Sequence, residues 1–220
     1  MKSLNQLLLD FDCVQNFRDD DFYVGKSNFH TFELINNWPK WEKNFLNISG
    51  EKFSGKTHLI NIFLKKFNGI RIEANLLNDY NLKKIKTYQN IVLEDLTLGA
   101  NEKLIYTLFN IIDQDNKFLI ITSSIPITEI DFKLEDLKSR TKNCLLTKIE
   151  NPDDELIFAL ILKNLSDRQI TLDKKLIDFI IKRVERSYGK IFEFIYKIDK
   201  ISLKKKRSID FKIINEALEE

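Results

Sequence analysis

Eight consecutive residues, from Gly50 to Thr57, have the sequence Gly-Glu-Lys-Phe-Ser-Gly-Lys-Thr and fit every fixed position of the pattern GxxxxGK[ST]. Glycines at this spacing let consecutive backbone N–H groups face inward and form a concave anion site. Lys56 would reach the β- and γ-phosphates of a nucleotide, and the hydroxyl of Thr57 would bind Mg²⁺. The pattern therefore predicts a nucleotide-binding phosphate loop.

The segments on either side of this loop have the patterns of a strand and a helix. Residues 45–49 form a short apolar run that predicts a buried strand. Residues 58–67 carry apolar side chains at helical spacing. A helix that begins at the loop adds the positive end of its dipole to the anion site. Strand, loop and helix occur in the order that phosphate binding requires; the alternative is a chance glycine-lysine turn before a helix.

Two acids, Glu94 and Asp95, end a second apolar run over residues 91–96. This pattern is typical of a buried parallel strand with functional carboxylates at its C-terminal end. One acid would bind Mg²⁺ together with Thr57, and the other would orient an attacking water. The sequence leaves open which acid serves the metal, and a pair of exposed turn acids is the alternative.

A third apolar run, residues 117–124, ends in the hydroxyl residues Thr122, Ser123 and Ser124. A polar group at that strand tip could contact the γ-phosphate. Simple termination of the strand by serine and threonine is the alternative. Residues 133–140 then predict a short helix that ends at Arg140.

The segment Phe22-Tyr23-Val24-Gly25-Lys26-Ser27-Asn28 precedes another helical pattern. A turn at Gly25 could place backbone groups and either Phe22 or Val24 against an adenine ring. The alternative is an ordinary helix N-terminus, since Ser27 and Asn28 are common capping residues.

The order of these patterns predicts an α/β fold, in which a parallel-sheet domain is followed by a small all-helical lid domain. We expect a mobile N-terminal arm over residues 1–20, the nucleotide-binding domain over 21–150 and the lid over 151–220. Helices are predicted in the lid at residues 153–166, 172–184, 187–202 and 209–218. The basic run Lys204-Lys205-Lys206-Arg207 is expected in the last interhelical loop, either as a solvated turn or as a nucleic-acid contact.

The composition argues against a protein whose main work is coating nucleic acid, because the formal net charge is only +2. Two cysteines, Cys13 and Cys144, have no CxxC spacing, which indicates neither a disulfide framework nor a zinc site. No signal peptide or membrane span is recognisable in the sequence. We therefore expect a soluble protein of the cytoplasm.

Several of these segments resemble motifs of the AAA+ family and, within it, of the DnaA family, closest to its short regulators of the Hda type. Residues 22–28 resemble the FxVGxSN segment, residues 54–59 the GKTHL phosphate loop, and residues 91–96 the second acidic motif. Residues 122–126 resemble the strand-end sensor, and 134–140 the LKSR segment. The resemblance implies that Arg140 is a catalytic arginine finger, directed at a nucleotide on a neighbouring subunit. It also implies a nucleotide site that contains the residues Phe22, Val24, Gly25, Gly50, Ser54, Gly55, Lys56, Thr57 and His58.

Three departures from the family pattern bear on hydrolysis. The acidic pair begins with Glu94, Ser124 stands where the sensor has an aspartate, and Gly189 aligns with a lid arginine that faces the phosphates. Lys190 is adjacent to Gly189 and is the candidate replacement for that arginine. Each departure removes charge or alters geometry, so we expect at most weak intrinsic ATPase activity and tight binding of ADP.

The N-terminal segment Gln6-Leu7-Leu8-Leu9-Asp10-Phe11 resembles the QLxLx[LF] peptide that docks on the bacterial sliding clamp, the beta subunit of DNA polymerase III. By this resemblance Gln6 enters a polar pocket, whereas Leu7, Leu9 and Phe11 enter an apolar groove. Packing of the same amphipathic stretch on the protein's own surface is the alternative.

Together the resemblances imply a regulator that binds ADP or ATP with Mg²⁺, docks on the DNA-loaded clamp and stimulates hydrolysis of ATP bound to the initiator DnaA. This activity would negatively regulate replication initiation. The sequence ends after the last lid helix, so we expect no sequence-specific DNA recognition by a further domain. A helicase loader of the DnaC type and a free-standing ATPase are the alternatives, and a homo-oligomer is possible.

Overall fold

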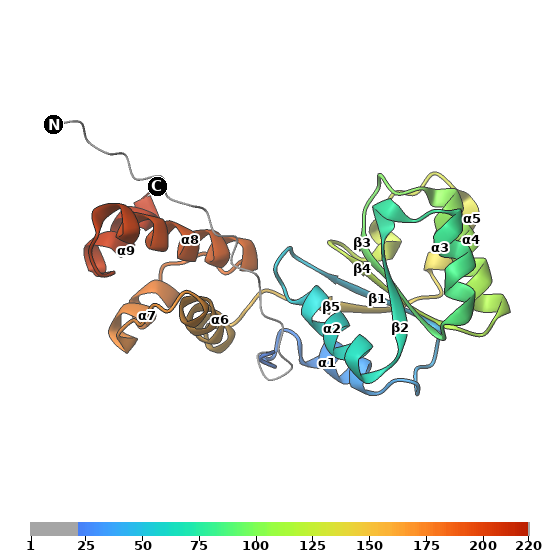
Figure 1. The fold of residues 1–220 in the computed structure, drawn as a ribbon, viewed down its shortest axis with the longest axis horizontal. Coiled ribbons are helices and arrows are strands. Elements are labelled where there is room, and N and C mark those ends of the chain that lie inside the picture. Colours follow the sequence, from blue (N-terminus) through green and yellow to red (C-terminus); the bar gives the residue numbers. More distant parts are fainter. Residues whose placement is uncertain (1–21, 220) are drawn as a thin grey trace.

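The computed structural model describes residues 22–219, which form a parallel β-sheet flanked by helices and then a group of helices (Figure 1). The strands are β1 (Phe45–Gly50), β2 (Gly69–Glu73), β3 (Asn90–Leu96), β4 (Phe118–Ser123) and β5 (Leu145–Ile149). The helices that accompany the sheet are α1 (Phe29–Asn36), α2 (Lys56–Lys66), α3 (Asp79–Lys84), α4 (Glu102–Gln114) and α5 (Glu135–Thr141). The helices that follow are α6 (Asp154–Asp167), α7 (Lys174–Ile181), α8 (Tyr188–Lys205) and α9 (Phe211–Glu219). The predicted α/β class and helical lid are confirmed.

The sheet has the strand order β2-β3-β4-β1-β5, with every neighbouring pair parallel. The phosphate-loop strand β1 therefore lies between β4 and β5. Ser49 at its end pairs with Ser123 of β4, and Gly50 pairs with Ile149 of β5. Because the strands are parallel, the loop after β1, the acids of β3 and the hydroxyls of β4 all lie at one edge of the sheet, the position where open α/β sheets bind ligands.

Successive residues of the inner strands alternate between two apolar layers, as expected from the two-residue period of a strand. Leu46, Ile48, Val92 and Ile120 pack with α1 and α2. The residues between them, including Phe45, Leu93 and Ile121, pack with α3, α4 and α5 on the other face. Both faces of the sheet are therefore covered by helices, which explains why the central strands are apolar throughout.

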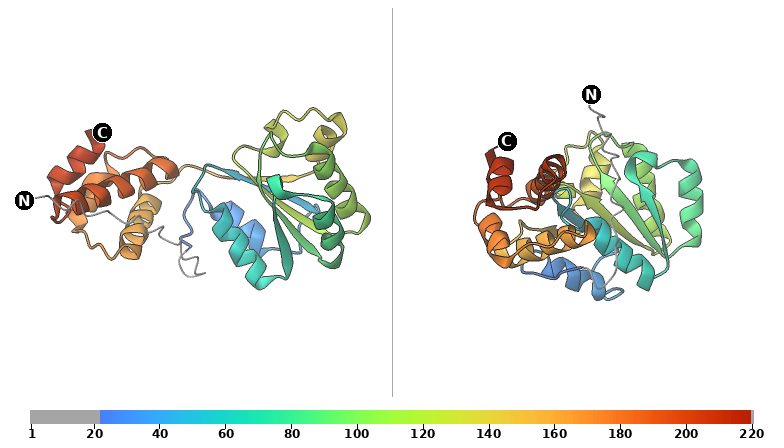
Figure 2. Two further views of the ribbon diagram at one scale, coloured as in Figure 1. Left: turned by 45° about the horizontal axis from the view of Figure 1, so that its top comes forward. Right: turned by 60° about the vertical axis from the view of Figure 1, so that its left-hand side comes forward.

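The helices α6–α9 have their own apolar core and lie to one side of the sheet (Figure 2). Their bounds agree with the predicted segments to within a few residues, with one correction. Lys204 and Lys205 belong to α8 rather than to the following loop, and the helix is terminated by Lys206 in a left-handed conformation with φ 51°. Lysines in a last helical turn interact favourably with the negative end of the dipole, which accounts for the longer helix.

Glu150 lies between β5 and α6, and both its backbone N–H and its backbone carbonyl form hydrogen bonds. Its N–H donates to the carbonyl of Ser27 at 2.9 Å, and its carbonyl accepts from the hydroxyl of Tyr188 at 3.1 Å. Ser27 precedes α1 and Tyr188 begins α8, so one residue joins the N-terminal segment, the connection and the lid. The domain boundary that we propose near residue 150 falls at this connection.

Cys144 lies in the core beneath α5 and is a free thiol. Burial raises its pKa to about 12, so it remains a protonated, apolar-like side chain at neutral pH. Between residues 22 and 219 no helix combines the length and the apolar character that a bilayer crossing needs.

Candidate functional site

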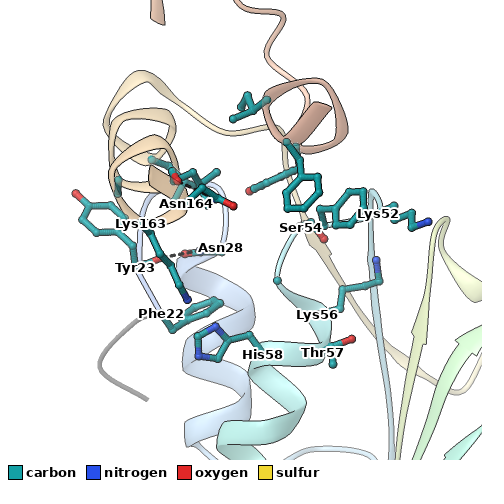
Figure 3. Close-up of a pocket in the computed structure, with 18 of the residues that line it drawn as sticks. Phe22, Tyr23, Asn28, Lys52, Ser54, Lys56, Thr57, His58, Lys163 and Asn164 are labelled. Carbon is teal, nitrogen blue, oxygen red and sulfur yellow. Dashed lines mark hydrogen bonds between the residues drawn. The ribbon is translucent and has the colours of Figure 1, made fainter. Parts of the chain in front are cut away.

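A cavity of about 590 Å³ lies between the phosphate loop, the N-terminal segment and the lid (Figure 3). This volume is within the range of small-molecule sites, roughly 300–1,000 Å³. The sequence-predicted residues that line it are Phe22, Ser54, Gly55, Lys56, Thr57, His58, Asp95 and Ser124. Further lining comes from α6 and α8, including Leu156, Lys163, Asn164, Asp167, Tyr188 and Phe192. The structure thus brings most of the predicted nucleotide site together around one space.

The two loop glycines are required for different reasons. Gly55 has φ 95°, a left-handed conformation that side chains strain, and α2 begins at the next residue. A Cβ on Gly50 would lie 2.8 Å from the Ser54 hydroxyl oxygen. That hydroxyl is buried and has no hydrogen-bond partner among the residues that the structure describes. A bound phosphate would supply the missing partner.

The ammonium group of Lys56 donates to the carbonyl of Gly50 at 2.7 Å and to that of Glu51 at 2.9 Å. Burial lowers the pKa of Lys56, and the charges of Asp95, Glu51 and Glu94 oppose this shift. A largely desolvated cation gains more from an anionic ligand than one already in water. Lys56 is therefore suited to hold phosphate.

Glu94 is almost fully buried and lies beside Thr57, which forms a side-chain hydrogen bond with it. One carboxylate oxygen, Oε2, is 3.2 Å from Nε of Arg71 on β2. The other, Oε1, is buried and finds no partner within the described part of the chain. Burial raises the pKa of Glu94, and Arg71 opposes this rise. Glu94 and Thr57 together form an incomplete set of oxygen ligands.

This pair fits Mg²⁺, which is typically bound by one or two carboxylates, waters and the phosphates of a substrate. No cluster of three or more acidic, histidine or cysteine side chains suited to a metal occurs in residues 22–219. Of the two acids whose roles the sequence left open, Glu94 is the one beside Thr57. We therefore assign the metal position to Glu94 as a proposal.

Asp95 lines the cavity, at the point where β3 is irregular between Leu93 and Leu96. The residue has φ 54°, and its backbone N–H donates to the hydroxyl of Thr122 at 3.0 Å. Glu94, by contrast, is buried and does not line the cavity, so the two consecutive acids have different surroundings. Asp95 is thereby placed where it could orient a water against a phosphate, the second of the two predicted roles.

The three sensor candidates at the end of β4 differ in their surroundings. Ser124 lines the cavity, whereas the Thr122 hydroxyl is used by Asp95. The hydroxyl of Ser123 donates to the carbonyl of Ile125 at 2.6 Å and accepts from the side chain of Asn47 at 2.9 Å. Sequence patterns gave no signal for Asn47, because it is a buried polar residue within an apolar strand. Ser124 is thus the sensor candidate with access to a ligand.

The N-terminal segment lines one end of the cavity through Phe22, Tyr23 and Asn28 (Figure 3). Phe22 packs edge-on against His58, with 5.2 Å between ring centroids. The Asn28 side chain donates to the carbonyl of Tyr23 and accepts from the N–H of Gly25, both at 2.9 Å. It forms no side-chain capping bond to α1, so it organises the turn at Gly25 rather than the helix start.

Val24 does not lie where the sequence analysis expects it, and Lys163 is a side chain near this end that the sequence analysis did not identify. Val24 lines a neighbouring groove of about 1,170 Å³ instead of this cavity. Lys163 of α6 extends toward Phe22 (Figure 3). An aromatic ring together with polar side chains is a suitable surface for a nucleobase.

Arg140 and Lys190 lie outside the cavity lining formed by the described residues. Arg140 forms an ion pair with Asp113 of α4 and lies over the ring of Tyr106, 5.3 Å from its centroid. The ammonium of Lys190 is 3.0 Å from the carboxylate of Glu193 in the same helix. Both assignments remain predictions. The predicted clamp-binding residues Gln6, Leu7, Leu9 and Phe11 lie outside the described residues.

Comparison with known proteins supports a specific family. Residues 153–218 match the family described as Hda, lid domain. The replication initiator DnaA of Helicobacter hepaticus is 27% identical over 197 residues, which are 78% of this chain and 42% of that protein. An uncharacterised protein of Haemophilus influenzae is 24% identical over 226 residues, 97% of this chain and 98% of its own length. The chain thus spans about half the length of the DnaA relatives it matches.

Solved structures share the fold. Domain III of the Thermotoga maritima initiator DnaA superposes with a TM-score of 0.73 at 20% identity, covering 92% of this chain and 95% of that one. DnaA of Aquifex aeolicus, solved with AMPPCP bound, superposes with a TM-score of 0.65 at 21% identity, covering 84% and 65% respectively.

Proposed function

Because the chain is a AAA+ protein of the DnaA family, of the Hda type, we propose that it is a nucleotide-binding regulator of replication initiation. It holds ADP or ATP with Mg²⁺ in the cavity and presents Arg140 to the ATP of a neighbouring DnaA initiator. A guanidinium supplied in this way stabilises charge that develops on the transferred phosphoryl group. Hydrolysis on DnaA would then restrain initiation, while the chain's own ATPase activity stays weak.

The observation that carries this proposal is the position of Arg140. It lies on α5, beside α4, and no atom of it lines the chain's own cavity as the described residues define it. Its side chain is 33% exposed, so it is accessible to a second protein. An arginine that served its own nucleotide would line the same cavity as Lys56.

The second part of the proposal concerns recruitment. Residues Gln6 to Phe11 would dock on the sliding clamp, which would bring the chain to DNA that carries a loaded clamp. Docking of a short peptide raises the effective concentration of the regulator near DnaA, without any new contact between the two proteins. The proposal places this activity in the cytoplasm, where chromosomal replication takes place.

The decisive experiment measures hydrolysis of ATP pre-bound to DnaA, in the presence of clamp loaded on DNA. The wild-type chain should accelerate hydrolysis, and Arg140→Ala should abolish the acceleration, since such arginines contribute about 10³- to 10⁵-fold in related systems. Lys142→Ala is the matched control, because it removes one exposed positive charge from the end of the same helix. Equal stimulation by all three proteins would refute the role of Arg140.

Recruitment is tested separately by titrating purified clamp with the full chain and with Gln6→Ala. We expect the variant to bind more weakly while its affinity for ADP stays unchanged. Equal clamp affinity of the two proteins would remove the docking step from the proposal and leave the role of Arg140 intact.

A further inference from the structure

The carboxylate of Glu51, in the phosphate loop, is bound by the first turn of the lid helix α8. It accepts hydrogen bonds from the hydroxyl of Ser187 at 2.5 Å, from the N–H of Tyr188 at 3.0 Å and from the N–H of Gly189 at 3.2 Å. Glu51 and α8 are more than 130 residues apart in sequence. The contact therefore joins the part of the chain that would hold phosphates to the lid.

This arrangement uses the donors at the start of α8. The first N–H groups of a helix have no partner within the helix, and its dipole makes that end attractive to anions. In α8 the N–H groups of Tyr188 and Gly189 donate to Glu51, and that of Lys190 donates to the capping hydroxyl of Ser187 at 3.3 Å. The first three donors of the helix are thus satisfied by protein groups.

Glycine at position 189 leaves room for the carboxylate of Glu51. A Cβ at this position would lie 3.0 Å from Oε1 of Glu51, closer than real Cβ atoms normally approach another heavy atom. A larger residue would push the carboxylate away from the helix. The glycine that stands where the family resemblance places an arginine is therefore explained by the close approach of Glu51.

A second residue of the same loop also contacts α8. The ring of Phe53 stacks on that of Phe192, with 4.6 Å between centroids and 9° between planes. Phe53 has φ 69°, a strained conformation for a residue with a side chain. Aromatic pairs of this kind stabilise a contact beyond the burial of their surface, which helps to offset that strain. The phosphate loop therefore holds α8 both through the hydrogen bonds of Glu51 and through the stacked ring of Phe53.

We propose that Glu51 locks α8 onto the phosphate loop and withholds its N-terminal donors from a terminal phosphate, so that the third phosphate of ATP adds little to the affinity. This inference rests on the proposed nucleotide binding. A free helix N-terminus is a ready phosphate site, and α8 borders the cavity through Tyr188 and Phe192. With Glu51 in place, the N–H donors of Tyr188 and Gly189 are occupied, and the loop carries a negative charge that disfavours a further phosphate.

The test titrates the full chain with ADP and with ATP, each with Mg²⁺, and compares wild type with Glu51→Gln. For wild type we expect ATP to bind no more tightly than ADP. Glu51→Gln loses the charge and part of the hydrogen bonding, so the preference for ATP over ADP should rise about tenfold. Glu33→Gln makes the same chemical change at an exposed position of α1 and should leave the ratio unchanged.

Amide hydrogen exchange at Tyr188 and Gly189 gives a second readout without nucleotide. Both amides should exchange slowly in wild type and faster in Glu51→Gln. Gly189→Ala should also raise the ATP preference, because the added Cβ displaces the carboxylate while Glu51 remains.

A strong ATP preference in wild type, or an unchanged ratio and unchanged exchange in both variants, would overturn the inference while nucleotide binding stands. Failure of wild type to bind either nucleotide would instead remove the proposed function. In that case the amide exchange of Tyr188 and Gly189 alone tests the contact between Glu51 and α8. Unchanged exchange in Glu51→Gln would show that Glu51 does not hold α8.

Discussion

The backbone N–H of Asp95 donates a hydrogen bond to the hydroxyl of Thr122, with 3.0 Å between nitrogen and oxygen. Asp95 adopts a left-handed conformation, which is uncommon for residues other than glycine and is maintained only where the surroundings enforce it. Thr122 is 1% exposed and belongs to the neighbouring strand β4. The direction of the second acid thus depends on a threonine of the adjacent strand.

The first prediction tests this dependence. Thr122→Val keeps the shape of the side chain but leaves the Asp95 N–H without its acceptor, so the free energy of unfolding should fall by about 1–3 kcal/mol. Urea unfolding measures the change. Thr107→Val is the control, since the Thr107 hydroxyl is exposed and bonds only its own helix. Equal losses in the two variants would contradict the proposed support of Asp95.

The second prediction concerns Lys56. Lys56→Ala should weaken ADP binding on the order of 100-fold, because charge-assisted hydrogen bonds to phosphate are lost. The desolvated ammonium has a lowered pKa, so its removal should not reduce stability as a buried apolar truncation would. Isothermal titration and thermal unfolding measure the two effects. Lys40→Ala, at an exposed position, should change neither, and undiminished ADP binding by Lys56→Ala would argue against the phosphate site.

The third prediction concerns pH. Burial raises the pKa of Glu94 above the ordinary value of 4.5. Between the two pKa values the unfolded chain has released this proton and the folded protein retains it. The free energy of unfolding therefore falls as pH rises through this interval, and then levels off. Glu94→Gln removes this titration, so the variant should be more stable than the parent at neutral pH.

The stabilities of wild type and Glu94→Gln should also be compared below pH 4.5. There Glu94 is neutral in both the folded and the unfolded wild-type chain, so the difference in the free energy of unfolding between the two proteins should shrink. Urea unfolding across this pH range provides the measurement, with Glu33→Gln as the control for a glutamate exposed in the folded state. A gain in stability that is independent of pH would mean that a cause other than the buried charge is responsible.

The fourth prediction concerns the ion pair of Arg140 with Asp113, which rests on the proposed function. Because Arg140 must leave Asp113 to reach another subunit, Asp113→Asn should increase stimulation of ATP hydrolysis on DnaA. An exposed ion pair is worth about 0–1 kcal/mol, so the increase should be at most about fivefold. Asp115→Asn removes a neighbouring carboxylate that pairs with Lys117 and serves as the control. Reduced stimulation by Asp113→Asn would instead mean that Asp113 positions the arginine for its task.

Much of the fold was predictable because its signals are local. The apolar run at residues 91–96 became β3, and the helical pattern at 187–202 became most of α8. The phosphate loop is defined by residues adjacent in sequence, so Lys56 and Thr57 could be placed in the cavity before the structure was known. Fixed spacing and one local conformation suffice for such a motif.

The contacts of Glu51 and Arg71 could not be predicted in this way. Glu51 occupies a position of the motif that accepts any residue, and its partners come from the lid. The pairing of Arg71 with Glu94 depends on the register of two strands, which places Glu73 and Glu94 side by side. Strand order and lid orientation arise from packing between distant segments, and a single sequence carries no direct signal of either.

The hydrogen bonds of Glu150 have a consequence for how the lid moves. Its N–H and carbonyl belong to the two peptide units on either side of a single α-carbon, and they fasten the segment before α1 and the start of α8 respectively. Rotation of the backbone at Glu150 changes the angle between these two peptide units, so the two bonds are retained together only in the present orientation. Reorientation of the lid should therefore cost at least one of these two hydrogen bonds, and Glu150 is the point at which that cost arises.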